Sequence, residues 1–129
     1  MQLNHLNASK EQIQALLALP QDEPVVMVNI LRFLAKTEAG NETGAEAYAR
    51  YGRNVFPLVK AVGGEILFQS KVLETVIGEP DGAPHTFLLV RYPSIPAFIK
   101  MATSEEYKAI SHDRIMALEY GGLYLTQEG

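Results

Sequence analysis

The sequence contains no cysteine in its 129 residues. A chain without cysteine cannot form a disulfide, a thiolate nucleophile or a thiolate metal site, and this usage is typical of a reducing compartment, so we expect a cytoplasmic protein. The chain also lacks any run of the roughly 18 to 20 apolar residues that a membrane-spanning helix needs, and its first residues lack the basic start and apolar run of a signal peptide. We therefore expect the chain to stay in solution.

Positive charge is scarce in this chain. Lysine and arginine number 11 against 15 aspartates and glutamates, which gives a formal net charge of -4. Such a chain is repelled by phosphate backbones and by anionic membrane surfaces. We expect neither nucleic acid nor a membrane among its partners.

Motifs for cofactors are missing as well. The 3 histidines are scattered and form no i, i+4 pair that could hold a metal ion. The sequence has no dinucleotide fingerprint and no nucleophile elbow, and Gly63-Gly64 follows a predicted helix, which is the wrong context for a phosphate loop. We expect no metal and no cofactor.

The composition that remains is that of an ordinary globular protein, with 47% hydrophobic and 20% charged residues. A chain of this length forms one domain and can bury about two thirds of its unfolded surface. We expect a single domain over residues 1–129, with an appended helical segment at 1–20 and a core at 24–126.

The N-terminal half starts with a short helix and a strand. Ser9 is placed to cap a helix over residues 10–19, and Pro20 ends it. Residues 25–33, VVMVNILRF, are apolar in both alternating registers. This pattern predicts a strand that is buried on both faces.

A long helix follows a polar loop. Thr43 and Glu46 have the spacing of a capping box at its start, and Gly63-Gly64 supplies a left-handed residue at its end. Pro57 removes one backbone hydrogen bond inside this segment. The sequence therefore predicts either one kinked helix or two short ones.

The C-terminal half combines a hairpin with further helices. The predicted elements are, in order, a strand over 65–77 that is either continuous or broken at Ser70-Lys71, a turn over 79–84, a strand over 85–92, a helix capped by Ser94, a helix capped by Ser104 and closed by Gly121-Gly122, and a strand over 123–126. The two strands that flank the turn should pair as a hairpin.

The order of elements after the first helix is β-α-β-β-α-β. This order predicts an α+β fold, a ferredoxin-like sandwich in which helices cover one face of a four-stranded antiparallel sheet. The strands over 25–33 and 85–92 are apolar on both faces, and no further helix remains to cover the second face. We therefore expect a homodimer in which two copies pack through the open sheet face.

Several motifs point to a known family. They are VMVNILRF at 26–33, AYARYG at 47–52, Pro57 ahead of Gly63-Gly64, VRYPS at 90–94 and SEEYKAISHDR at 104–114. Together they resemble domain-of-unknown-function family 1330, within the dimeric α+β barrel superfamily. The resemblance implies the ferredoxin-like fold, the dimer, and a cavity between the helices and the sheet, but it implies no particular reaction.

Asn29 and Arg32 interrupt an otherwise apolar strand. An unpaired buried polar group costs about 1 to 3 kcal/mol, so both side chains need partners. In one interpretation Asn29 orients a ligand carbonyl or hydroxyl and Arg32 binds a ligand carboxylate. In the other, Asn29 satisfies neighbouring backbone, and Arg32 pairs with a carboxylate such as Glu46 or Glu119. Residues three apart lie on opposite faces of a strand, so these two need not share a pocket.

Tyr107 and Arg114 lie seven residues apart and so share one helix face. They could form the polar end of a cavity whose apolar walls come from Phe87 and Leu89. Tyr51, on the sheet-facing side of the preceding long helix, is a third candidate ligand-binding residue. The alternative is a tether between helix and sheet that binds no ligand.

His112 is the candidate catalytic residue. It stands between Ser111 and Asp113, and histidine is suited to general acid or base chemistry near neutral pH. Because successive helix residues point in different directions, the alternative is a solvated surface histidine.

Three functions therefore stay open. The first is binding of a small, partly apolar, oxygenated or carboxylate-bearing molecule between helices and sheet, by Asn29, Arg32, Tyr51, Tyr107 and Arg114. The second is a cofactor-independent enzyme of the monooxygenase or isomerase kind that uses His112 or a tyrosine. The third is a dimeric packing or partner-binding module without a ligand site.

Overall fold

The structure, a computed structural model, describes residues 7–128. Its elements are α1 (Lys10–Leu17), β1 (Val25–Phe33), α2 (Gly44–Ala61), β2 (Glu65–Gln69), β3 (Thr86–Tyr92), α3 (Ile95–Ala102), α4 (Glu105–Ala117) and β4 (Leu118–Thr126). The predicted α+β fold is confirmed. Of the N-terminal segment predicted at 1–20, residues 1–6 lie outside the described residues, and the rest contains α1.

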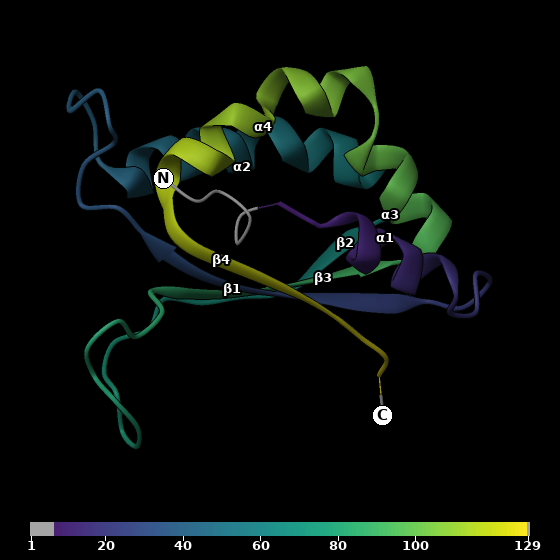
Figure 1. Cartoon of the computed structure of the whole chain (residues 1–129), viewed down its shortest axis with the longest axis horizontal. Helices are drawn as coiled ribbons and strands as arrows, with labels where there is room; N and C mark the ends of the chain where they lie inside the picture. Colours follow the sequence, from purple (N-terminus) through teal and green to yellow (C-terminus); the bar gives the residue numbers. More distant parts are fainter. Residues whose placement is uncertain (1–6, 129) are drawn as a thin grey trace.

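The four strands form one antiparallel sheet in the order β2-β3-β1-β4. The helices all lie on the same side of this sheet (Figure 1). On the opposite side, which we call the open face, no helix lies against the sheet anywhere in residues 7–128 (Figure 1). None of the helices in this range has the length and apolar character needed to span a bilayer.

β1 lies in the middle of the sheet and contributes to both faces. Met27 and Leu31 are buried under the helices in two apolar clusters. Val28 and Ile30 alternate with them and pair with Leu89 and Phe87 of β3 on the open face. The prediction of a strand with two apolar faces is confirmed in its bounds, and it explains why one layer of helices cannot cover all of its apolar surface.

α2 begins and ends as the sequence predicts. Thr43 and Glu46 form the capping box, with each side chain accepting from the other residue's backbone N–H. The helix runs through Pro57 as one element, and Gly63 beyond its end has φ 85°. Of the two alternatives for this segment, the single helix is the one observed.

Of the two alternatives for the strand over 65–77, the break at Ser70-Lys71 is the one observed, since β2 ends at Gln69 and no strand follows before β3 among the described residues. Beyond it, the backbone N–H of Ser70 donates to Phe87 O at 3.0 Å and that of Val72 to His85 O at 2.8 Å. Residues further along have branched side chains that favour a strand but no neighbouring strand to pair with. Residues 70–85 therefore form an irregular arm between β2 and β3, which extends away from the helices (Figure 1).

Gly121-Gly122 was predicted to close the last helix, and this prediction is wrong. α4 ends at Ala117, and both glycines lie inside β4. A Cβ on Gly122 would come within 2.6 Å of Tyr120 Oη, and a Cβ on Gly121 within 2.6 Å of Leu118 Cδ1. The glycines are explained by close packing of neighbouring side chains against the strand, not by a helix end.

Candidate functional site

A cavity of about 700 Å³ lies between the helices and the sheet. Its volume falls within the range of roughly 300 to 1,000 Å³ that is typical of small-molecule sites. Most of its lining is apolar, and these residues come from both layers: Met27, Val55, Val59, Leu88, Val90, Tyr92, Phe98, Met101 and Leu125. The composition suits an organic molecule with a sizeable apolar part.

The walls predicted from β3 were assigned to the wrong register. Leu88 and Val90 line the cavity, whereas Phe87 and Leu89 do not. The register explains the correction, because Leu88 pairs with Asn29 of β1, and Asn29 lies on the helix side of the sheet. Side chains alternate along a strand, so Phe87 and Leu89 face the open side.

Four of the residues singled out from the sequence line this cavity, and we call these four together its polar end. Asn29 of β1, Tyr51 of α2, and Tyr107 and Arg114 of α4 all line the same space. The hydroxyls of Tyr51 and Tyr107 lie 2.9 Å apart, and their rings meet edge to face at 84°. Three elements that are distant in sequence thus bring polar groups together against an apolar wall.

The tyrosines of this polar end are hydrogen-bond donors. Burial raises the pKa of the Tyr51 hydroxyl well above its ordinary value, and the adjacent Tyr107 raises it further. Burial also raises the pKa of Tyr48 to about 12, which the Arg114 guanidinium partly offsets. These hydroxyls stay protonated at neutral pH. In the Tyr51–Tyr107 pair one hydroxyl donates to the other, and the accepting one keeps its own proton for a ligand oxygen.

Asn29 pairs with neighbouring backbone and also lines the cavity. Its side chain is 9% exposed, and its Nδ2 donates to the carbonyl oxygen of Leu88 at 3.3 Å. Hydrogen bonding to neighbouring backbone is therefore observed. The amide also lines the cavity, where its Oδ1 and second N–H are able to bind a polar ligand group.

Arg114 connects α4 to the sheet. Its Nη2 donates to the carbonyl oxygen of Gly121 in β4 at 3.3 Å, so a tether between helix and sheet is present. The residue also lines the cavity. A guanidinium has five N–H donors in a planar fork whose geometry matches a carboxylate.

Arg32 does not belong to this site. Its Nε donates to Glu119 Oε2 at 2.9 Å, and its Nη1 donates to the carbonyl oxygen of Ala83. Glu119 is one of the two partners that the sequence suggested. Arg32 is absent from the cavity lining, as expected for a residue three positions from Asn29 on the same strand.

His112 is exposed and does not line the cavity. Ser111 and Arg114 of the same helix do line it, and successive residues of a helix are turned by about 100°. His112 therefore points away from the space that would hold a ligand. Its predicted role as a general acid or base gains no support from its position.

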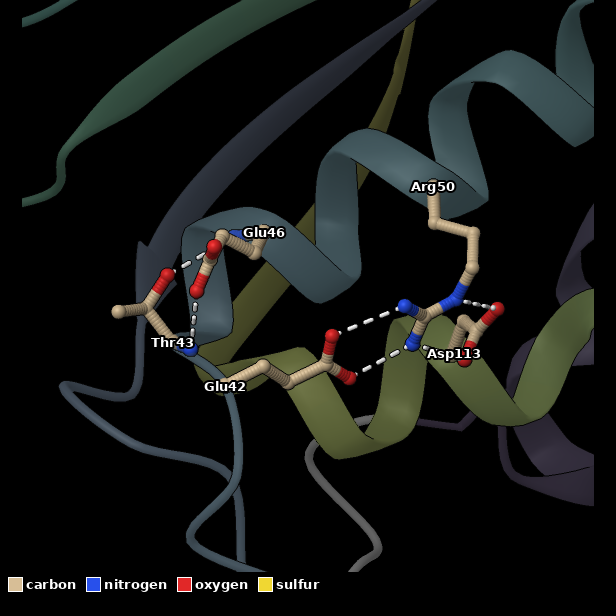
Figure 2. Close-up of polar contacts among 5 residues, drawn as sticks. All are labelled: Glu42, Thr43, Glu46, Arg50 and Asp113. Atoms are coloured by element: carbon tan, nitrogen blue, oxygen red, sulfur yellow. Dashed lines mark hydrogen bonds and ion pairs between the residues drawn. The ribbon is translucent and has the colours of Figure 1, made fainter.

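An ion-pair network that the sequence analysis missed holds α2 against α4. Arg50 forms ion pairs with Glu42 and Asp113 (Figure 2). Its Nη2 lies 2.7 Å from Glu42 Oε1 and 2.9 Å from Asp113 Oδ1. Hydrogen bonds from Arg50 lower the pKa of the Asp113 carboxyl. Arg50 and Asp113 directly precede Tyr51 and Arg114 in the sequence. The network therefore holds together the two helices that carry most residues of the polar end. The sequence gives no signal of it beyond a basic and an acidic residue on two helices.

The helix α1 also contributes to the cavity, which the sequence analysis did not anticipate. Gln12, Ile13 and Leu16 are part of the lining, and no residue of α1 is buried. In residues 7–128, no three acidic or histidine side chains gather closely enough to hold a metal ion.

Comparisons with known proteins support the fold. The sequence profile of the family described as "Domain of unknown function (DUF1330)" matches residues 38–126. A crystal structure of a protein of unknown function from Rhodopseudomonas palustris is 29% identical, with a TM-score of 0.89 and 97% of each chain covered. A search of curated proteins finds no match to this chain.

Two more distant structures share the fold. A putative antibiotic biosynthesis monooxygenase from Caulobacter crescentus is 13% identical, with a TM-score of 0.56, covering 84% of this chain and 92% of that one. A Dabb family protein with a ferredoxin-like fold from Mesorhizobium loti is 11% identical, with a TM-score of 0.52, covering 82% of this chain and 97% of that one. At these identities the likeness shows the ferredoxin-like fold alone.

Proposed function

We propose a function for this chain, which belongs to the DUF1330 family. The description of that family assigns no activity, so the proposal is based on the cavity. The function is binding of a small organic molecule that has an apolar body and one carboxylate or carbonyl group. The observation that carries this proposal is that Asn29, Tyr51, Tyr107 and Arg114, from three elements, line one mainly apolar cavity.

The chemistry of the polar end selects an acceptor group on the ligand. Protonated tyrosine hydroxyls and a guanidinium are all donors, and the guanidinium adds a positive charge. A carboxylate or a polarised carbonyl oxygen complements them, whereas an amine would face like charge. Donors that converge in a half-buried, apolar environment bind an anion more strongly than the same groups in water.

Binding, more than turnover, is the function that this geometry supports. A general acid or base must reach the ligand directly or through one water molecule, and His112 lies outside the cavity lining. The cofactor-independent enzyme considered from the sequence would thus have to rely on the tyrosines. Since burial holds Tyr48 and Tyr51 in their protonated form, they favour a fixed hydrogen-bonding role.

The assembly that we propose is a homodimer through the open face. Phe68 and Tyr124 on the edge strands of that face are 54% and 52% exposed, and Phe87 and Leu89 lie between them. A second copy would cover this apolar surface with the same surface. Native mass spectrometry of freshly purified protein tests the mass of the dimer, and release of an additional mass on denaturation would identify a retained ligand.

Decanoate is a suitable probe of the cavity, with decanol as the matched neutral molecule. The chain has no tryptophan, and all 6 tyrosines line the cavity. Because Tyr124 also lies on the open face, each titration of tyrosine fluorescence is made at one protein concentration, so that the change reports on occupancy of the cavity. We expect wild-type protein to bind decanoate more tightly than decanol. If neither molecule changes the fluorescence below its micellar concentration, the binding proposal fails.

Arg114→Met tests the role of the guanidinium. Loss of a charged partner should weaken decanoate binding about 10-fold or more and leave decanol binding nearly unchanged. Arg32→Met is the matched control, because it removes the same group from the open side of β1, outside the cavity lining. Equal effects of the two substitutions on decanoate would show that Arg114 is not a binding residue.

A further inference from the structure

The arm formed by residues 70–85 is anchored at its base. The backbone N–H of His85 donates to Leu31 O of β1 at 2.7 Å, and that of Val72 donates to His85 O at 2.8 Å. Arg32 adds a hydrogen bond from its guanidinium to Ala83 O. The root of the arm is thus held in a fixed direction by the central strand, and Figure 1 shows that this direction is away from the helices, on the side of the open face.

The outer part of the arm exposes large apolar side chains. Leu73, Val76 and Ile77 are 85%, 90% and 94% exposed, the highest values among the large apolar residues that the structure describes. Single exposed apolar residues are common on protein surfaces, but three within five positions of a projecting segment are not. Such a segment is typical of a surface that is covered in an assembly.

We propose that this arm clasps a second copy of the chain, with Leu73, Val76 and Ile77 lying on the partner beyond the edge of the sheet. The inference rests on the homodimer proposed above and adds to it a distinct contact that the sheet does not provide. The occupant is a second copy because the arm stands beside the open face, so any chain seated on that face meets the arm as well (Figure 1).

The size of the open face suits an interface between two copies. Strands of 5 to 9 residues, at about 3.3 Å per residue and about 4.8 Å between strands, give the four-stranded sheet a projected area of roughly 500 Å². A stable interface of standard size buries about 800 Å² of accessible surface on each partner. Side chains make the accessible area of a face larger than its projected area, so the open face is of the size that a dimer needs, and the arm of each copy would extend the contact beyond the sheet.

Two-fold symmetry doubles the contribution of the arm. In a two-fold dimer each arm packs on the other copy, so one substitution removes two contacts. Ile77→Asp replaces a nearly fully exposed residue and should leave the folded monomer intact. In the dimer it would place a carboxylate in an apolar contact twice, which should raise the dissociation constant of the dimer about 100-fold or more.

Sedimentation velocity over a range of concentrations tests this inference, with circular dichroism to confirm that each variant is folded. Leu17→Asp is the matched control, since Leu17 is an exposed apolar residue on α1, in the layer of helices. We expect wild type and Leu17→Asp to form the same dimer and Ile77→Asp to dissociate at concentrations where they do not. If Ile77→Asp dimerises as tightly as wild type, the arm is not part of the interface.

The exposed Lys71 gives a second measurement, because trypsin can cut the arm at this residue. Burial of the arm in a dimer should slow the cut at high protein concentration, and Ile77→Asp should remove this protection. A wild-type chain that is monomeric and cut at one rate at all concentrations would overturn both the arm and the dimer. Decanoate binding would still be measurable in that case, so failure here is distinguishable from failure of the proposed binding function.

Discussion

Two glycines of α2 have opposite surroundings. Gly44, the first residue of the helix, is buried, and a Cβ there would clash with the carbonyl oxygens of Ala117 and Leu34. Gly52, near the middle of the helix, has no atom within 4 Å of the position a Cβ would take. Neither has a positive φ angle. The first glycine is therefore needed for close approach of α4 and β1, whereas the second contributes only backbone flexibility.

This contrast gives a prediction for stability. Gly52→Ala should increase the free energy of unfolding by about 0.5 to 1 kcal/mol, because alanine loses less backbone entropy in a helix. Gly44→Ala should decrease it by about 1 to 3 kcal/mol, because buried backbone must shift to admit the methyl group. Urea unfolding followed by circular dichroism measures both. A destabilising effect of Gly52→Ala would contradict the open surroundings of this glycine.

Single residues also show how far the candidate site could be predicted from sequence. The seven-residue spacing of Tyr107 and Arg114 was sufficient to place both on one helix face, and the break in an apolar strand was sufficient to find Asn29. The pairing of Tyr51 with Tyr107 joins two helices at a separation that no local pattern encodes. The wall residues Phe87 and Leu89 were wrongly assigned because β3 is apolar on both faces. Its sequence therefore does not show which of its side chains face the helices.

At the scale of elements, the packing of α2 on α4 depends on charge as well as on apolar contacts. Arg50 bridges Glu42 at the foot of α2 and Asp113 on α4 (Figure 2). Asp113 is hydrogen-bonded to Arg50, which lowers the pKa of its carboxyl below the ordinary value of about 4. A group with a lowered folded-state pKa stabilises the fold above its unfolded-state pKa and loses that effect as the pH falls through the folded-state value.

The resulting prediction concerns stability between pH 6 and pH 2. Asp113→Asn should lower the urea midpoint at pH 6, and the difference from wild type should narrow as the pH falls below about 4. Acidification protonates other carboxylates in both proteins, so only the difference between them is informative. In an Arg50→Met background, Asp113→Asn should have little effect at any pH. A constant difference across this range would show that the Asp113 carboxylate does not stabilise α4 through Arg50.

Elements were predicted best where their ends have local chemical signals. The caps at Ser9, Thr43, Ser94 and Ser104 are all observed, because a side-chain oxygen that accepts from a nearby backbone N–H leaves a pattern in four consecutive residues. The end of β2 has no such signal, since it depends on where β3 stops pairing. Gly121 and Gly122 of β4 were wrongly assigned to a helix end, because a helix end and close packing of side chains against a strand both favour glycine.

At the scale of the whole molecule, β1 separates two surfaces. Asn29 faces the cavity under the helices, while Val28 and Ile30 face the open side. A ligand in the cavity and a partner on the open face would thus contact alternate residues of β1, and they would come near each other only at the edge strand β4, where Tyr124 lines the cavity as well. Among the described residues, the cavity lining includes no residue of the arm. The two proposed functions should therefore be independent.

This independence is testable with variants that each remove one function. Ile77→Asp should be monomeric at concentrations where wild type is a dimer, yet bind decanoate with an affinity within about 3-fold of wild type, since its cavity is complete within one chain. Arg114→Met should lose decanoate affinity and keep the dissociation constant of the dimer. Sedimentation velocity and tyrosine fluorescence, measured on the same preparations, give both quantities. Loss of decanoate binding in the monomeric variant would contradict this independence. It would mean that β1 holds Asn29 in its binding position only when a partner lies against Val28 and Ile30.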